Sequence, residues 1–391
     1  MMASLMGMMA LAIDIMLPAF DAIARHYALS DANDQQLIFF SYILGFGFPQ
    51  LFYGPITDRF GRKGLLRLCL LGYIFFAFVC MATQSFMFLL IARFLQGVAS
   101  AGIRVVVLSI VRDITKGRGM ARVMSLIMTV FMAIPIFAPI IGEGIIRVSS
   151  WKWTFGALGL FGAICLIWTE VRLKETLPVD ARMPLNFKTA FKSYRIVCTN
   201  RVTLGYILAG GLIFSALFAF LAASEQIFTD TFGYEDSFPL LFAGIAGTLV
   251  VANYANSRLV ERLGMRLISH TVLFAFTGLA VLSLILMHVF GEHFMIFYPL
   301  FALNFGCFGM LGANFTALSL EPMGERAGTA NAANGFIGTT VAAAIGYWVA
   351  DQYDGTVTPF LMGFAVLGFT TLLVVFVTER GRLFQAGAGK S

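Results

Sequence analysis

Several ionisable side chains lie within long apolar runs of this chain, where they could carry protons or pair with a charged ligand. Asp14 lies in the segment Ala12–Pro18, Glu143 lies in a later apolar run, and Arg93 and Arg104 share another. A carboxyl group in surroundings of low dielectric constant can exchange a proton near neutral pH, and it also suits pairing with a cationic ligand. We therefore take Asp14 and Glu143 as candidates for proton coupling, with Arg93 as the charge that tunes Asp14.

The two arginines predict a polar face on one helix. They are 11 positions apart, which places them about 20° apart around a helix and roughly 16 Å apart along it. Gln96, Gly97 and Ser100 fall on the same stripe, so we interpret this face as one wall of an aqueous cavity, with Arg104 near the middle of the run. Arg93 has an alternative role, in which its side chain reaches the outer interface by snorkelling.

The acidic candidates also have structural alternatives. Asp14 could form a hydrogen bond with the backbone of a neighbouring span, and Glu143 could be solvated at the outer end of its run. Glu225 closes its apolar run, so we expect it to be partly in water. Glu143 shares a helix face with Pro135 and Pro139. Because Pro139 cannot donate to the carbonyl of Pro135, this helix should be weakened and able to bend.

The composition indicates a membrane protein. The chain is 59% hydrophobic and 12% charged, with a mean hydropathy of +0.84, whereas a soluble protein carries about 25% charged residues. Its apolar runs reach the length of about 20 residues that a transmembrane helix needs. We predict an all-α membrane protein whose twelve spans form two pseudo-symmetric six-helix bundles. The predicted spans are Met1–Ala22, Gln36–Tyr53, Leu65–Ala82, Phe86–Val111, Met120–Ile146, Trp153–Val171, Val202–Ser224, Phe238–Asn256, Leu267–Phe290, Phe294–Leu320, Thr329–Ala350 and Thr358–Val377.

The basic residues predict the orientation of the spans. One set of alternate connections holds most of the 27 Lys and Arg residues, whereas the opposite set holds only Arg25, Arg147 and Lys152 together with several acids. Basic connections face the cytoplasm by the positive-inside rule, so we expect both termini to be cytoplasmic. The net charge of +6 therefore reflects topology and does not indicate a nucleic-acid partner.

Other classes of protein find no support in the sequence. It contains no Gly-x-x-x-x-Gly-Lys-Ser/Thr loop for a nucleotide and no repeated motif for a channel filter. Neither the cysteines nor the histidines form the sets that a disulfide framework, a zinc site or an intramembrane hydrolase would need, so we expect no metal and no cofactor. The residues concerned are Cys69, Cys80, Cys165, Cys198, Cys307, His26, His270, His288 and His293.

The chain contains an internal repeat. The basic segment Gly54–Lys63 lies between two apolar runs, and its part Asp58–Lys63 aligns with Glu261–Arg266, which again lies between two runs. The longest polar connection separates six spans from six. We therefore predict one bundle at 1–171, a cytoplasmic linker at 172–201 and a second bundle at 202–391. Duplicated bundles of this kind are most often transporters.

These motifs resemble those of the major facilitator superfamily, and more narrowly those of the twelve-span drug:proton antiporters of the bicyclomycin and chloramphenicol resistance type (Bcr/CflA-like). The resemblance covers essentially the whole chain. Its most specific match is Gly54–Lys63, which resembles the superfamily's loop between spans two and three. In the fifth-span motif, Ala138 replaces the usual glycine and Glu143 replaces a second small residue. The other matching segments are Asp14–Pro18, Arg93–Gly97, Pro135–Gly142, Glu321–Gly324 and Ala327–Ala330.

The resemblance implies alternating access by two six-helix halves around a central cavity, which the first, fourth, seventh and tenth spans line. Asp14 and Arg93 then lie on lining helices, whereas Arg104 matches no family motif and receives no family role. The candidate residues of the substrate cavity are Asp14, Arg104, Phe214, Phe218, Glu225, Asn304 and Asn314. The bend of the fifth span is expected at Pro135, Pro139 and Gly142.

The resemblance also implies a cytoplasmic latch that holds the outward-open state. Asp58 can accept hydrogen bonds from the N-terminal amides of a neighbouring helix, where the helix dipole favours an anion. Arg62 could bridge Asp58 to Asp113. The candidate latch residues are Gly54, Asp58, Arg59, Gly61, Arg62, Lys63 and Asp113.

We therefore expect a monomeric, proton-coupled exporter of drugs or other small amphipathic molecules in the bacterial inner membrane. Its partners would be a small-molecule substrate, protons and the lipid bilayer. The alternative is an exporter of a single metabolite, such as an amino acid, a sugar or a siderophore, with the same fold. Two arginines that face acids inside the cavity would favour zwitterionic or neutral polar cargo.

Overall fold

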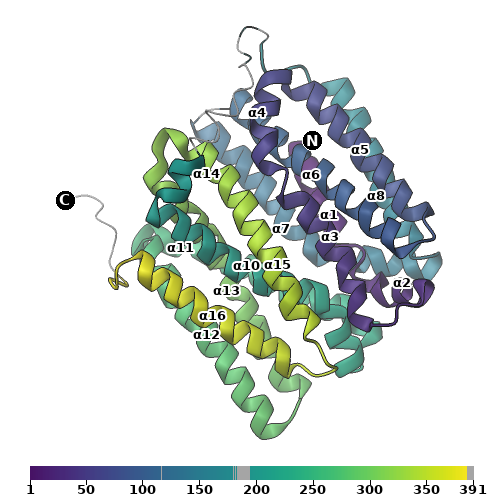
Figure 1. Ribbon diagram of the computed structural model, residues 1–391, viewed down its shortest axis with the longest axis vertical. Helices are drawn as coiled ribbons and strands as arrows, with labels where there is room; N and C mark the ends of the chain where they lie inside the picture. The colour runs from purple at the N-terminus through teal and green to yellow at the C-terminus, as the bar shows by residue number, and fades with distance from the viewer. Residues whose placement is uncertain (116, 179, 181, 183–193, 385–391) are drawn as a thin grey trace. The chain divides into compact units, whose positions relative to one another are not determined.

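The computed structural model describes residues 1–115, 117–178, 180, 182 and 194–384. These residues form helices joined by short connections, with no strand among them. The chain divides into two compact units, Met1–Phe191 and Lys192–Ser391 (Figure 1). The division falls within the stretch 172–201 that the sequence assigns to a linker, and residues 179, 181 and 183–193 of that stretch lie outside the described part of the chain.

The first unit combines long helices with short 3-10 turns. Its helix α5 packs against α6 and α8, α3 packs against α6, and α1 packs against α7. In chain order the elements are α1 (Met2–Asp14), η1 (Leu17–Ala19), α2 (Phe20–Tyr27), η2 (Ala32–Gln36), α3 (Leu37–Gly47), α4 (Gln50–Phe60), α5 (Arg62–Ala82), α6 (Phe86–Ile114), α7 (Gly117–Val148) and α8 (Lys152–Arg172).

Helix α1 ends at Asp14 because a proline follows it. Pro18 has no N–H and cannot donate to the carbonyl of Asp14 four residues earlier. The chain continues through η1 and α2, and Met2–Tyr27 together form one candidate span of 26 residues. The first predicted span is therefore interrupted directly after its carboxylate.

Helices α3 and α4 form a bent pair. They meet at Pro49, which is the N-cap of α4, and their axes differ by 46°. Because α4 continues to Phe60 and α5 begins at Arg62, most of the segment Gly54–Lys63 is helical. The expectation of a loop along this whole segment is wrong, since two helices meet almost end to end with Gly61 between them.

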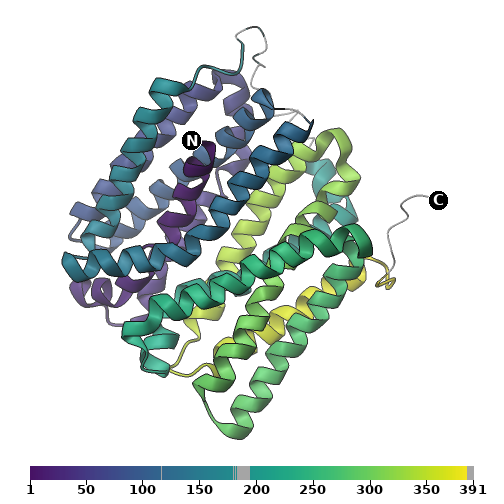
Figure 2. The ribbon, with the colours of Figure 1, turned by 180° about the vertical axis from the view of Figure 1, so that it is seen from behind.

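The second unit contains long helices with irregular turns at their ends. Helix α10 packs against α13, α15 and α16, and α12 lies against α13 and α16. Seen from behind, α11, α12 and α13 lie side by side (Figure 2). In chain order the elements are α10 (Arg201–Gln226), η4 (Ile227–Thr231), η5 (Glu235–Ser237), α11 (Phe238–Leu263), α12 (Met265–Phe290), α13 (Phe294–Leu320), η6 (Glu321–Arg326), α14 (Ala327–Ala333), η7 (Asn334–Gly338), α15 (Thr339–Asp351) and α16 (Thr358–Thr378).

Two glycines form equivalent joints in the two units. Gly61 joins α4 to α5 with φ 89° and ψ 169°, and Gly264 joins α11 to α12 with φ 80° and ψ 155°. Residues with a side chain rarely adopt a positive φ, so both joints require glycine. The sequence repeat is therefore also a repeat of backbone geometry.

Within the described residues, ten helices are long and apolar enough to cross a membrane, and the bent pair α3–α4 raises the number to eleven. The predicted span Thr329–Ala350 is covered by α14, the π-helical turn η7 and α15, each of which is too short to qualify by itself. The all-helical, membrane-spanning fold class is confirmed. The number of spans found is ten or eleven, because this irregular stretch breaks what the sequence predicts as one helix.

Candidate functional site

Asp14 lies at the end of α1 with its side chain buried, 2% of its surface being exposed. No described residue donates a hydrogen bond to its carboxylate or forms an ion pair with it. The alternative of a structural hydrogen bond to a neighbouring backbone is therefore not found in the described part of the chain. Buried charged groups are normally paired, and an unpaired ionisable residue inside a membrane span is a candidate functional group.

Arg93 lies in α6 and is fully buried. Its Nη1 donates to Gln96 Oε1 at 2.7 Å, and its Nη2 donates to the carbonyl oxygen of Ala12 at 3.1 Å. The guanidinium carbon also lies 4.4 Å from the centroid of the Tyr42 ring, within the range of a cation–π interaction. Snorkelling to the outer interface is therefore wrong for Arg93, because α1, α3 and α6 hold its charge inside the unit.

Three elements of the predicted site meet at the end of α1. Arg93 forms no ion pair with Asp14, but it binds the carbonyl of Ala12 two residues earlier. From α7, a Cβ atom on Gly142 would overlap the carbonyl oxygen of Ile15, the residue that follows Asp14. Glycine therefore allows α7 to lie directly against the break in α1.

The small and polar face of α6 packs against α3. Ser100 Oγ accepts a hydrogen bond from the Tyr42 hydroxyl at 2.8 Å, and a Cβ atom on Gly97 would overlap the Tyr42 carbonyl oxygen. Gln96 and Ser100 have no exposed surface. The interpretation of these residues as a cavity wall is wrong, because small side chains here allow two helices to approach closely.

Arg104 is half-buried and contacts the bend between α3 and α4. Its Nη1 donates to Gln50 Oε1 at 2.9 Å, and its guanidinium carbon lies 5.7 Å from the centroid of the Phe46 ring. Gln50 Nε2 in turn donates to the carbonyl of Phe46 at 3.0 Å. Arg104 thus joins α6 to the bend between α3 and α4. The sequence analysis did not predict this contact.

Glu143 pairs with Arg147 one turn later in α7. Arg147 Nε lies 2.8 Å from Glu143 Oε1, and the two side chains are 58% and 27% exposed, respectively. Glu143 therefore has a charged partner on its own helix and is only partly exposed. Helix α7 runs through both Pro135 and Pro139 without an interruption of its helical backbone.

In the second unit, α10 carries three of the predicted cavity residues. Phe214 and Phe218 are half-buried and meet edge to face, with centroids 6.2 Å apart. Glu225 is buried, and Thr229 Oγ1 lies 3.5 Å from its Oε1. The expectation that Glu225 is partly in water is wrong, because α10 continues beyond it into the π-helical turn η4.

The two predicted cavity asparagines of α13 form contacts between helices. Asn314 and Asn256 exchange amide hydrogen bonds at 2.9 and 3.2 Å, which join α13 to α11. Asn304 Nδ2 donates to the carbonyl of Phe276 in α12 at 2.8 Å. Both side chains are buried, so the structure shows a role for them in packing within the second unit.

The predicted bridge by Arg62 is present. Its Nη1 donates to Asp58 Oδ1 at 2.7 Å, and its Nε donates to Asp113 Oδ2 at 2.9 Å. Lys63 lies beside it, with Nζ 3.6 Å from Glu170 Oε2. Arg62 therefore links the end of α4, the start of α5 and the end of α6. Its side chain is only 8% exposed, whereas that of Asp58 is 47% exposed.

A residue that the sequence analysis missed caps α5. The backbone amides of Arg62 and Lys63 donate to Glu175 at 2.9 and 3.1 Å, so the prediction that Asp58 accepts from helix N-terminal amides is wrong for α5. Burial by itself raises the pKa of the Glu175 carboxyl, but four backbone amides donate to the charged form and hold its pKa below its ordinary value. Glu175 follows α8 in a polar stretch without a sequence motif.

A second network, also absent from the sequence analysis, centres on Arg266 at the start of α12. Its Nη2 donates to Glu321 Oε2 at 2.8 Å, and its Nε donates to Glu379 Oε1 at 3.1 Å. The Tyr206 hydroxyl donates to the same oxygen of Glu379 at 2.6 Å. These bonds connect α12 with α10 and with the C-terminal ends of α13 and α16.

Comparison with known proteins defines the class of this protein. Residues 2–347 match the family model of the Major Facilitator Superfamily. The chain is 31% identical over 349 residues to the MFS-type transporter YdgK of Bacillus subtilis, covering 86% of this chain and 85% of YdgK. It is 30% identical over 371 residues to the bicyclomycin resistance protein homolog of Haemophilus influenzae, covering 94% of this chain and 92% of that protein. Over 376 residues, it is 26% identical to multidrug resistance protein MdtL of Escherichia coli O157:H7, covering 95% and 92%.

Solved structures agree with this fold. A D-xylose-proton symporter superposes with a TM-score of 0.74 at 12% identity and 98% coverage of both chains. The human organic anion transporter MFSD10 superposes with a TM-score of 0.64 at 17% identity, with 95% of this chain and 98% of that chain covered. The fold and the family match define a multi-pass membrane transporter and not an enzyme. The chain belongs to the Major Facilitator Superfamily, and its distant relatives include drug-resistance proteins.

Proposed function

We propose that this protein exports drugs or other small amphipathic molecules across the bacterial inner membrane in exchange for protons, by alternating access. The observation that carries the proposal is Asp14, a buried carboxyl group without a described partner at the broken end of α1. The names of two relatives, a bicyclomycin resistance protein homolog and multidrug resistance protein MdtL, support a drug as the cargo.

Asp14 would couple the two fluxes through its charge. In the inward-open state, Asp14 is deprotonated while the cargo is bound. After the switch to the outward-open state, a periplasmic proton neutralises Asp14, the cargo binds more weakly and it leaves. Arg93 holds the last turn of α1 through the Ala12 carbonyl, and Gly142 of α7 lies against the following residue. A change of charge at Asp14 therefore acts on a point where α1, α6 and α7 meet.

The Arg62 bridge would be the cytoplasmic latch of the outward-open state. Two features support this role: the bridge joins three helix ends, and the basic connections lie on the side that the positive-inside rule assigns to the cytoplasm. In this scheme 1–171 and 202–391 are the two moving halves and 172–201 is the linker. The protein acts as a monomer with both termini cytoplasmic, and Phe214 and Phe218 offer aromatic surface to an apolar cargo.

A second candidate is an exporter of one polar metabolite. The observation that favours it is the pair of buried or half-buried arginines, Arg93 and Arg104, in the first unit. Fixed positive charges suit a zwitterionic or neutral polar cargo better than a cationic drug.

The two candidates are separated by growth and flux measurements on the wild type and Asp14→Asn. Cells that lack their own exporters would express each form and be grown on a panel of antibiotics and metabolites. Inverted vesicles would then report whether uptake of the active compound needs a proton gradient. Asp21→Asn is the matched control, because Asp21 is a carboxylate on α2 that pairs with Arg25 at the surface.

For a drug:proton antiporter, resistance and gradient-driven flux fall to the level of empty cells with Asp14→Asn and stay near wild type with Asp21→Asn. Resistance to no antibiotic, together with gradient-driven flux of one metabolite, would select the second candidate. Undiminished gradient-driven export by Asp14→Asn, at equal expression, would refute the role of Asp14 in both.

A further inference from the structure

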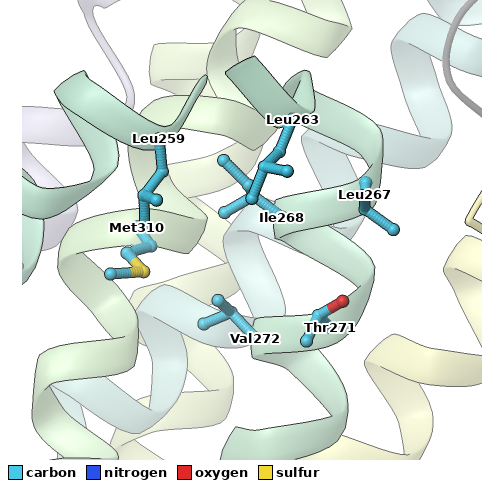
Figure 3. Close-up of a pocket in the computed structure, with 7 residues that line it drawn as sticks. All are labelled: Leu259, Leu263, Leu267, Ile268, Thr271, Val272 and Met310. Carbon is cyan, nitrogen blue, oxygen red and sulfur yellow. The ribbon is translucent and has the colours of Figure 1, made fainter. Parts of the chain in front are cut away.

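The groove between α11 and α12 in the second unit has no charged residue among those that the structure places along it (Figure 3). Its seven lining residues are apolar apart from Thr271. A group that takes part in proton exchange needs a charge or a strong hydrogen bond, so this groove offers nothing to that exchange. The interior of the first unit does hold a charge, at Arg93.

Arg93 is a buried positive charge without an acidic partner. Its side chain has no exposed surface, and no described residue forms an ion pair with it. Its hydrogen-bond acceptors are the amide oxygen of Gln96 and the carbonyl oxygens of Ala12 and Ile38, all of which are neutral. Buried charges are normally paired with an opposite charge, so other groups must offset the cost of burying this guanidinium.

Two aromatic rings from different helices provide that compensation. The guanidinium carbon of Arg93 lies 4.4 Å from the centroid of Tyr42 on α3 and 5.7 Å from the centroid of Phe155 on α8. Both distances are within the range of a cation–π interaction, which is stronger when the two groups are desolvated. None of the three side chains has exposed surface. Tyr42, at the shorter distance, should contribute most.

The surroundings of Tyr42 fix the position of its ring. Its hydroxyl donates to Ser100 Oγ at 2.8 Å, and its ring stacks with that of Phe46, with centroids 6.4 Å apart and an interplanar angle of 8°. The backbone of Tyr42 lies against Gly97 of α6, where an added Cβ atom would overlap the Tyr42 carbonyl oxygen. The ring is thus held by α6 and by the next turn of α3, with Arg93 against it.

We propose that Tyr42 is a positioning residue for the exchange of cargo and protons, a role that rests on the proposed function. Its ring offsets the Arg93 charge in place of a carboxylate. It thereby keeps the guanidinium on the Ala12 carbonyl, two residues before Asp14. A ring is neutral at every pH, so it holds Arg93 in the same way whether or not Asp14 carries a proton. A carboxylate partner would compete with Asp14 for protons.

The first test measures hydrogen–deuterium exchange in the full-length protein, purified in a neutral detergent. We expect Tyr42→Leu to raise deuterium uptake by peptides from the end of α1, because Arg93 no longer holds that turn. Tyr42→Phe keeps the ring and should behave as the wild type. Phe40→Leu is the matched control, since it removes a ring of α3 that is 2% exposed and lies about 200° around the helix from Tyr42.

A double variant separates the effect of the charge from that of packing. With Arg93→Met the side chain is neutral, so adding Tyr42→Leu should cause no further uptake at the end of α1. A rise of equal size in both backgrounds would show that Tyr42 acts by packing alone and would overturn the proposal. Unchanged uptake in Tyr42→Leu would also overturn it, and so would an equal rise in Tyr42→Phe or in Phe40→Leu.

Transport is measured in inverted vesicles with bicyclomycin, which the name of one relative contains, and with the other compounds of the growth panel. We expect Tyr42→Leu to lower the maximal rate of gradient-driven uptake at least about tenfold, because a desolvated cation–π contact is lost. The cargo concentration that gives half the maximal rate should stay unchanged, since the ring contacts Arg93 and not the cargo. Tyr42→Phe should retain the wild-type rate.

The outcomes distinguish the role of Tyr42 from the function on which it rests. A wild-type rate in Tyr42→Leu, together with loss of export in Asp14→Asn, would overturn the role of Tyr42 and leave the proposed function standing. A change confined to the half-maximal concentration would place Tyr42 at the cargo and would also overturn the positioning role. If wild-type vesicles took up no compound of the panel in response to a proton gradient, the proposed function would be wrong, and the role of Tyr42 in exchange with it.

Discussion

Arg93 and Arg104 lie on one helix but are held in different ways. Arg93 is fully buried and divides its donors between Gln96 and the carbonyl of Ala12, whereas Arg104 is half-buried and uses one side-chain acceptor, Gln50. The planar guanidinium can reach two acceptors at once, and the compact ammonium group of lysine cannot. The position of Arg93 therefore requires a side chain that can bind two acceptors at once, and a positive charge by itself is not sufficient.

We expect Arg93→Lys to lose gradient-driven export and to unfold more easily. The loss of one hydrogen bond from a charged donor costs about 1.5–3 kcal/mol, and at Arg93 one of the two short bonds is lost. Arg104→Lys is the matched variant, and its effect on both measurements should be smaller. Thermal unfolding in detergent and flux in vesicles are the two assays. Equal effects of the two substitutions would contradict a special role for the Arg93 geometry.

The lowered pKa of the Glu175 carboxyl should make the free energy of unfolding depend on pH. Although the partial desolvation of its carboxyl opposes ionisation, four backbone amides lower the pKa of that carboxyl in the folded protein. A group whose pKa is lower when folded stabilises the protein above its unfolded pKa, which is about 4.3 for Glu. This stabilisation is lost as the pH falls through the lower folded pKa.

The contribution is measured as the difference in unfolding temperature between wild type and Glu175→Gln from pH 3 to pH 7. We expect the wild type to be more stable at pH 7 by about 0.5–1 kcal/mol, the lower part of the range for a cap because Glu175 is exposed. The difference should shrink below about pH 4. Lys174→Gln, a neighbouring exposed position, controls for a general effect of surface charge. A difference that grows in acid would contradict the cap.

The sequence predicts part of this chemistry at the level of single residues. Arg62, Asp58 and Asp113 lie at the ends of predicted spans, so their bridge could be inferred from topology. Glu175 could not, because a carboxylate that binds backbone amides needs no partner side chain and leaves no motif. The sequence places Asn314 in a cavity, whereas the structure pairs it with Asn256. This pairing could not be predicted, because Asn256 lies on another helix, 58 positions away.

At the scale of elements, glycine determines how closely α3 and α6 approach. A Cβ atom on Gly97 would overlap the carbonyl oxygen of Tyr42, and backbone cannot move aside as a flexible side chain can. We expect Gly97→Ala to destabilise the protein by about 1–3 kcal/mol, the range for overpacking of a core. The measurement is thermal unfolding and the yield of monodisperse protein.

Gly278→Ala is the matched control for this prediction. Gly278 lies inside α12 with no atom within 4 Å of the added Cβ, and alanine is favoured over glycine within a helix by about 1 kcal/mol. Gly278→Ala should therefore be neutral or stabilising. If Gly97→Ala behaved in the same way, the close contact of α3 and α6 would not limit stability.

The elements themselves follow well from hydropathy, but their interruptions do not. The span Phe294–Leu320 was predicted with the bounds that α13 has, because an uninterrupted apolar run leaves one solution. Pro18 and Pro49 mark the breaks that were missed in the first two spans, and hydropathy averages over both of them. The stretch Thr329–Ala350 contains no proline, so its division by the π-helical turn η7 had no comparable signal.

At the scale of the whole molecule, the two repeats have the same backbone geometry at their glycine joints, but their charged residues form different ion pairs. Arg62 is aligned with Met265, which cannot bridge acids, and the second unit uses Arg266 instead. In the first repeat Asp58 pairs with Arg62, whereas its counterpart Glu261 is exposed and pairs with no described residue. The latch proposed for the first unit therefore has no equivalent at the same positions of the second.

We expect Asp58→Asn to weaken export without preventing folding, and Glu261→Gln to leave export unchanged. A half-exposed ion pair is worth about 1 kcal/mol or less, which limits the effect on a conformational equilibrium to roughly fivefold. Flux in vesicles at equal expression is the measurement. Normal export by Asp58→Asn, or an equal loss in both variants, would remove the evidence for a latch in the first unit.

The joints at Gly61 and Gly264 limit where amino acids can be inserted into this chain or deleted from it. Each is one residue long, so the rotational phase of the helix that follows is fixed by the helix that precedes it. An amino acid inserted at either joint and taken up by the next helix would turn the rest of that helix by about 100° and move its protein-facing side chains out of their contacts. We therefore expect insertions and deletions to be excluded from these two points, even though both lie in connections between helices.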